Sequence, residues 1–150
     1  MKHLLGLVLG LLLLVGCASP RTVTFLHIND VYEIAPLNNG KEGGMARVAQ
    51  VYKELKAQNP HTYFVLAGDF ISPSVVGTLR QDGKRIQGKH MIEVLNAAGL
   101  DYATFGNHEF DYDDPAPTVL QERLDESDFA WGIGNIRQRV GSETRPLMRR

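Results

Sequence analysis

The fold is decided by TYFVLAGDF, residues 62–70, an apolar run of aromatic and β-branched residues that ends at Gly68 and Asp69. Residues of these types favour a strand, and a Gly-Asp pair favours a turn. Two other apolar runs end in the same way: VTFLHI (23–28) before Asn29-Asp30, and YATF (102–105) before Gly106-Asn107. The sequence therefore predicts strands that each lead into a polar residue.

Helical patterns separate these strands. Apolar residues recur at helical spacing in two segments, 45–55 before Asn59-Pro60 and 91–98 before Gly99. A third helix is expected over residues 118–124 and a fourth strand over residues 129–136. Strands that alternate with helices predict an α/β fold, with a βαβαβ unit whose mainly parallel sheet carries the helices packed on it.

Polar side chains therefore follow three strands of one sheet, namely Asp30, Asp69 and Asn107. Ligands of parallel sheets bind outside the carboxyl ends of the strands, where these three residues would gather. Each one, taken alone, also suits a simple turn. Together, their oxygen atoms suit divalent cations and form a plausible half of a two-metal site for phosphate ester hydrolysis.

The amino terminus has the pattern of a secretory signal. Residues 1–16 hold one Lys and then an almost pure Leu/Val/Gly stretch, which is too short to span a bilayer. Cys17, the single cysteine of the 150 residues, follows directly and excludes a disulfide within the chain. The run Leu14 to Cys17 resembles the lipobox of bacterial lipoproteins, and a plain signal cut after Ala18 is the alternative.

The composition of the chain indicates which class of molecule it binds. The formal net charge is −1, so no basic field favours a nucleic acid strand, and a small substrate is expected. The tail from 137 to 150 has five arginines and no apolar periodicity, which predicts a disordered or truncated segment.

Three ordered blocks, LHINDVYE, VLAGDF and FGNHEFD, resemble the signature of the calcineurin-like metallophosphoesterases, and specifically of the bacterial secreted 5′-nucleotidase branch. The resemblance covers residues 22–136, so it implies the N-terminal part of a layered metallophosphoesterase domain. It implies two divalent metal ions of the Mn, Zn, Mg or Ca type and a small phosphate ester, a nucleotide, as the substrate.

The resemblance also implies roles for single residues. Asp30 would bind the first metal, Asp69 would bridge both metals and Asn107 would bind the second. His108 would stabilise charge on the phosphoryl oxygens, and Asp111 would orient this histidine and keep it protonated. Glu109 has no implied role, and we interpret it as a residue that holds the loop through backbone hydrogen bonds.

Two departures from the family pattern limit these roles. Tyr32 stands where the family has a histidine ligand, so its phenol either ligates the first metal or packs beside it. The family also takes further histidines, and a nucleoside-binding domain, from sequence beyond position 150. We therefore expect this chain to be an inactive N-terminal fragment.

The predicted organisation is a lipoprotein-type signal peptide (1–16), a short linker (17–21) after a lipidated Cys17, the phosphoesterase part (22–136) and the basic tail (137–150). The protein would be exported and held in the cell envelope, at the outer membrane or the periplasmic face. The alternatives are a non-catalytic lipoprotein that binds metal or nucleotide, or a hydrolase of cyclic nucleotides or sulfur esters on the same scaffold.

Overall fold

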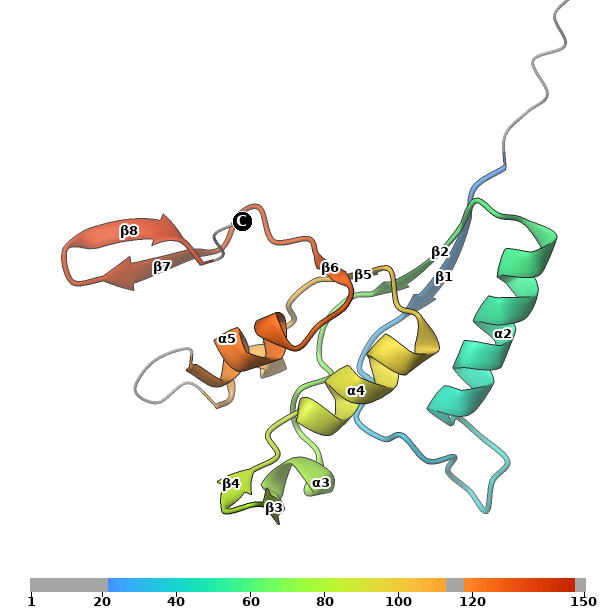
Figure 1. Ribbon diagram of the computed structural model, residues 1–150, viewed down its shortest axis with the longest axis horizontal. Helices are drawn as coiled ribbons and strands as arrows, with labels where there is room; N and C mark the ends of the chain where they lie inside the picture. The colour runs from blue at the N-terminus through green and yellow to red at the C-terminus, as the bar shows by residue number, and fades with distance from the viewer. Residues whose placement is uncertain (1–21, 113–117, 148–150) are drawn as a thin grey trace, which may run out of the picture.

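The computed structural model describes residues 22–112 and 118–147. The predicted signal peptide, Cys17 and the linker lie outside these residues. The centre of the described part is a four-stranded sheet in the order β1-β2-β5-β6 (Figure 1), and every neighbouring pair is parallel. Its strands are β1 (Thr24–Ile28), β2 (Thr62–Leu66), β5 (Tyr102–Ala103) and β6 (Ala130–Trp131). The predicted α/β class with a parallel sheet is confirmed.

Three helices connect these strands: α2 (Met45–Gln58), α4 (Lys89–Ala98) and α5 (Thr118–Asp125). Because the strand order follows the chain order without reversal, right-handed crossovers place these connections on the same face of the sheet. Figure 1 shows α2 and α4 lying along that face. Phe64 and Leu66 of β2 and Met91 and Leu95 of α4 belong to the buried core.

Among the described residues, no helix covers the opposite face of the sheet. Side chains alternate along β1 and β2, so Leu26 and Phe64 face the helices whereas Phe25 and Tyr63 face away from them. Phe25 is 64% exposed, and Tyr102 of β5 is 49% exposed. Parallel sheets are usually covered on both faces. An apolar surface therefore lies on this face of the sheet, where His27 is exposed as well.

Shorter elements lie between these strands and helices. They are α3 (Val75–Thr78), the hairpin of β3 (Arg80–Gln81) and β4 (Lys84–Arg85), and the 3-10 turn η1 (His108–Phe110). The strands β5 and β6 are two residues long and thus shorter than predicted.

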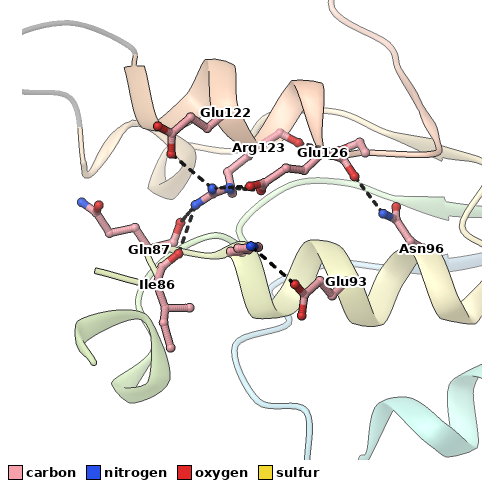
Figure 2. A network of polar contacts seen from close by, with 9 residues as sticks. Ile86, Gln87, Glu93, Asn96, Glu122, Arg123 and Glu126 are labelled. Carbon is pink, nitrogen blue, oxygen red and sulfur yellow. Dashed lines mark hydrogen bonds and ion pairs between the residues drawn. The ribbon is translucent and has the colours of Figure 1, made fainter. Parts of the chain in front are cut away.

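Buried Arg123 ties α5 to the segment before α4 (Figure 2). Its guanidinium donates to the backbone oxygens of Ile86 and Gln87, at 3.0 and 2.9 Å, and pairs with Glu126 at 2.6 Å. The Asn96 side chain of α4 donates to the backbone oxygen of Glu126 at 2.8 Å. This network fixes the position of α5 against α4, and it satisfies a charge that burial would otherwise penalise.

The tail differs from its prediction. Residues Arg137–Val140 (β7) pair antiparallel with Glu143–Pro146 (β8), so most of the segment that we expected to be disordered forms a hairpin. The two strands pair across a turn at Gly141, whose φ is 64°. This pairing orders the segment although its sequence has no apolar periodicity. Within residues 22–112 and 118–147, no helix is both long and apolar enough to cross a membrane.

Candidate active site

The two predicted aspartate ligands follow adjacent parallel strands. Asp30 comes after β1 and Asp69 after β2, and both have the left-handed backbone conformation, with φ angles of 54° and 59°. The backbone N–H of Asp30 donates to the oxygen of Gly68 at 3.2 Å, which extends the pairing of β1 and β2 into the turns. Residues other than glycine rarely adopt this conformation, and such outliers cluster at functional sites.

Two glycines allow the loops after β2 and β5 to touch. We name residues 67–74 the second-strand loop and residues 104–112 the third-strand loop. A Cβ atom on Gly68 would lie 2.1 Å from the backbone nitrogen of Gly106, and one on Gly106 would lie 2.2 Å from Oδ1 of Asp69. Any larger side chain at either position would separate the loops, so Asp69 reaches the third-strand loop only because both residues are glycines.

Glu109 holds the two loops together from inside. Its side chain is 2% exposed. One carboxylate oxygen accepts the N–H groups of Asp69 and Gly106 at 2.8 and 2.5 Å. The other oxygen accepts the N–H groups of Phe70 and Ile71 at 2.8 and 3.3 Å. These bonds confirm our interpretation of Glu109 as a residue that holds the loop, and they extend it, because three of the four donors belong to the other loop.

His108 contacts two of the predicted site residues. Its backbone N–H donates to Oδ1 of Asp69 at 2.8 Å, and its Nδ1 lies 2.8 Å from Oδ2 of Asp111. The hydrogen bond to Asp111 raises the pKa of His108. The same bond, followed by one from Ser72, lowers the pKa of Asp111. The pair therefore favours an imidazolium beside a carboxylate, which is the state that the resemblance implied.

Tyr32 contacts two of the predicted site residues, Asp30 and His108. Its hydroxyl donates to Oδ1 of Asp30 at 3.1 Å, and its ring meets that of His108 edge-on at 6.1 Å between centroids. Burial, the bond to Asp30 and the negative charges of Asp30, Asp69 and Glu109 raise the pKa of Tyr32 to about 12. Asp30 and Tyr32 also line a cavity of about 270 Å³ that extends to Met45.

The charge of this region fits divalent cations. In the part of the chain that the structure describes, no Lys or Arg forms an ion pair with Asp30, Asp69 or Glu109. Carboxylates without a Lys or Arg partner keep their negative charge, and their oxygen atoms are the ligands that hard cations prefer. Across the same residues, however, no group of three or more His, Cys, Asp or Glu side chains is placed to hold a metal ion. The site fits cations by charge and donor type, and its donor set is small.

The structure therefore brings Asp69, His108 and Asp111 into direct contact and places Asp30 at the next strand end. Asn107 lies in the same loop with an exposed side chain. Sequence reasoning missed Ser72, whose hydroxyl donates to Asp111 at 2.9 Å. A serine carries no recognisable signal there, because its partner is 39 positions away.

The parallel sheet with acidic residues at its carboxyl edge agrees with the family comparison. Residues 23–137 match the model of the calcineurin-like phosphoesterases, and the chain belongs to this family.

Its relatives include nucleotidases. The snake venom 5′-nucleotidase of Gloydius brevicauda is 31% identical over 146 residues, which cover 85% of this chain and 24% of that protein. An uncharacterized protein in the pqq-V 5′ region of Acinetobacter calcoaceticus is 34% identical over 133 residues, covering 69% of this chain and 62% of that protein. The probable 5′-nucleotidase of Treponema pallidum is 31% identical over 117 residues, with 67% of this chain and 19% of that protein covered. The chain thus spans only part of each of these relatives.

Proposed function

We propose that the protein is a metal-dependent hydrolase of nucleotide phosphate esters, similar to 5′-nucleotidases. The observation that carries the proposal is the position of Asp69, whose carboxylate accepts the backbone N–H of His108 at 2.8 Å. A carboxylate suited to a cation thereby lies next to an imidazole that Asp111 holds at 2.8 Å. Two relatives named as 5′-nucleotidases support a nucleotide substrate.

Asp30, Asp69 and Asn107 would hold two divalent cations. When bound, such a pair of ions lowers the pKa of a water molecule and neutralises charge on a phosphoryl group. The hydrogen bond to Asp111 raises the pKa of His108, which favours the protonated imidazole. A protonated imidazole stabilises the charge that builds on phosphoryl oxygens and can give its proton to the leaving oxygen.

The activity is tested on the protein expressed from its complete reading frame without residues 1–21. Purified protein with Mn²⁺ should release inorganic phosphate from nucleoside 5′-monophosphates, and Asp69→Asn should abolish this release. Cyclic nucleotides and sulfur esters are assayed in parallel, and faster turnover of either one would replace the nucleotidase assignment. A folded, metal-loaded protein that hydrolyses none of these esters would contradict the proposed function.

A metal-binding module without catalysis is the second candidate, because the donor set is small. A catalytic ion usually has about three protein ligands of its own. For the 150-residue chain by itself, we therefore expect weak binding of Mn²⁺ or Zn²⁺ in calorimetry and no phosphate release above background. Metal-dependent release by this chain that Asp69→Asn abolishes would prove the ligand count wrong.

We also propose that the protein is exported and anchored in the cell envelope through a lipid on Cys17. The support is the apolar run of residues 1–16 directly before the single cysteine. In a bacterial host, metabolic labelling with a fatty acid should mark the wild-type chain and leave Cys17→Ser unlabelled. Equal labelling of the two proteins would exclude the anchor.

A further inference from the structure

We propose that Ser72 is a positioning residue that holds Asp111 in place for His108. The catalytic meaning of this role rests on the proposed function, whereas the contact itself does not. The Ser72 hydroxyl donates to Oδ2 of Asp111 at 2.9 Å. The same oxygen lies 2.8 Å from Nδ1 of His108. One carboxylate oxygen thus joins a hydroxyl from the second-strand loop to an imidazole in the third-strand loop.

Asp111 needs such a partner because its side chain is 40% exposed. An exposed carboxylate can rotate toward water, and each rotation would break the bond to the imidazole. Ser72 is only 4% exposed, so its hydroxyl approaches from the buried side. A buried hydroxyl without an acceptor destabilises the folded state. The rotamer of Asp111 that accepts both bonds is therefore favoured.

The backbone that carries Ser72 is itself held firmly. Glu109 accepts the N–H groups of Asp69, Phe70 and Ile71, the three residues that precede Ser72. Asp69 and Ser72 therefore sit at the two ends of one fixed segment. A single loop thus places both the predicted bridging ligand and the hydroxyl that orients Asp111.

Ser74 supplies a matched contrast within the same loop. It is 8% exposed, and its hydroxyl lies 3.3 Å from Nε2 of His90, which belongs to α4 and not to the site. Ser72 and Ser74 are both buried serines, two positions apart, and only Ser72 contacts Asp111. Loss of a buried serine hydroxyl as such can therefore be separated from loss of the contact with Asp111.

The contact has a defined consequence for the imidazole. A carboxylate only accepts hydrogen bonds, so Nδ1 of His108 must donate to Asp111. The remaining ring nitrogen, Nε2, is then left for the phosphoryl group or the leaving oxygen. Without Ser72, Asp111 would hold Nδ1 for a smaller fraction of the time, and fewer molecules would have the imidazole in its working orientation.

Kinetics on the protein from the complete reading frame test the role. Ser72→Ala should lower kcat roughly tenfold, the low end for a hydrogen bond to a charged group. KM and metal content should stay unchanged, and Ser74→Ala should keep the wild-type kcat. Ser72→Cys, which retains a weak donor, should fall between wild type and Ser72→Ala. In an Asp111→Ala background, Ser72→Ala should have no further effect. A full tenfold loss in that background would overturn the proposal.

A second measurement does not require activity. Ring ¹⁵N chemical shifts, recorded at alkaline pH where the imidazole is neutral, report which nitrogen of His108 carries the proton. The signals are assigned by their loss in His108→Gln. Wild type and Ser74→Ala should show the proton on Nδ1, and Ser72→Ala should move part of it to Nε2.

A His108 spectrum that responds to Asp111→Asn and remains unchanged in Ser72→Ala would refute the positioning role. A shifted spectrum in a protein without hydrolase activity would instead refute the proposed function and keep the role of Ser72 as a contact. The two failures are therefore distinguishable.

Discussion

The second- and third-strand loops differ sharply from the loop after β1, residues 29–33, which we name the first-strand loop. Five hydrogen bonds join the second- and third-strand loops, all of them through the side chains of Asp69, Glu109 or Asp111. The first-strand loop carries Asp30, whose side chain bonds only to its neighbours Asn29 and Tyr32 among the described residues.

This difference divides the candidate site into two halves. The half with Asp69, His108 and Asp111 is held by contacts between distant parts of the chain, and the exposed Asn107 lies in the same loop. The half with Asp30 is exposed and is held by local contacts and one backbone bond to Gly68. Preorganised groups lose little entropy when a ligand binds. We therefore expect substitutions of residues other than the predicted ligand Asp30 to have large effects in the first half and small effects in the second.

The largest expected effect belongs to His108. In the protein from the complete reading frame, His108→Ala should lower turnover by roughly two to four orders of magnitude, as for other acid–base or charge-stabilising groups. Its metal content should stay near wild type, whereas Asn107→Ala should lose metal. Both are measured by phosphate release and by elemental analysis. If His108→Ala emptied the site and Asn107→Ala did not, the assigned roles would be reversed.

The close approach of the two loops is tested by Gly68→Ala. The new Cβ would meet the backbone of Gly106, so we expect a loss of about 2–4 kcal/mol in the free energy of unfolding. Gly83→Ala is the matched control, because both glycines have a φ of 82° and nothing lies within 4 Å of a Cβ at Gly83. Strain alone should cost the control about 1 kcal/mol in urea unfolding. Equal losses of stability in Gly68→Ala and Gly83→Ala would mean that the close approach of the two loops does not restrict the side chain at position 68.

Asp111→Asn should lower the pKa of His108 toward its ordinary value, since the bond to Asp111 is the main cause of the raised pKa. In wild type, the raised pKa of His108 means that the pair stabilises the fold fully at a pH below the ordinary pKa of histidine. This stabilisation is lost as the pH rises through the raised pKa of His108. The lowered pKa of Asp111 ends the contribution as the pH falls through it. A proton NMR titration of His108 measures the shift. An unchanged pKa in Asp111→Asn would contradict the pairing.

The smallest effect is expected in the first-strand loop. Tyr32→Phe removes one hydrogen bond to an exposed carboxylate, so the free energy of unfolding should change by less than about 1 kcal/mol. We expect Mn²⁺ affinity to remain unchanged as well, because the Tyr32 hydroxyl uses its proton in the bond to Oδ1 of Asp30. Calorimetry measures both quantities. A tenfold loss of affinity would identify Tyr32 as a ligand and would remove the contrast between the two halves.

Local sequence patterns were sufficient for most elements of the fold. The runs before Asp30, Asp69 and Asn107 predicted three parallel strands, and helical spacing predicted α2 and α4. The hairpin at Arg137–Pro146 was missed, because its strands are polar and lack the alternation that marks a half-buried strand. The open face of the sheet was also missed. Which face the helices cover depends on strand order and crossover handedness, which no local pattern encodes.

The sequence by itself determined the chemistry that is available: oxygen donors after three strands, and an imidazole with two carboxylates within four positions, His108 to Asp111. Only the tertiary structure decided which hydrogen-bond partners each of these groups has. It turned Glu109 inward to the N–H groups of the second-strand loop and left Asp111 to His108 and Ser72. The physical reason is that a carboxylate bonds to whichever donors the fold brings within about 3 Å, and here most of those donors come from residues almost 40 positions away.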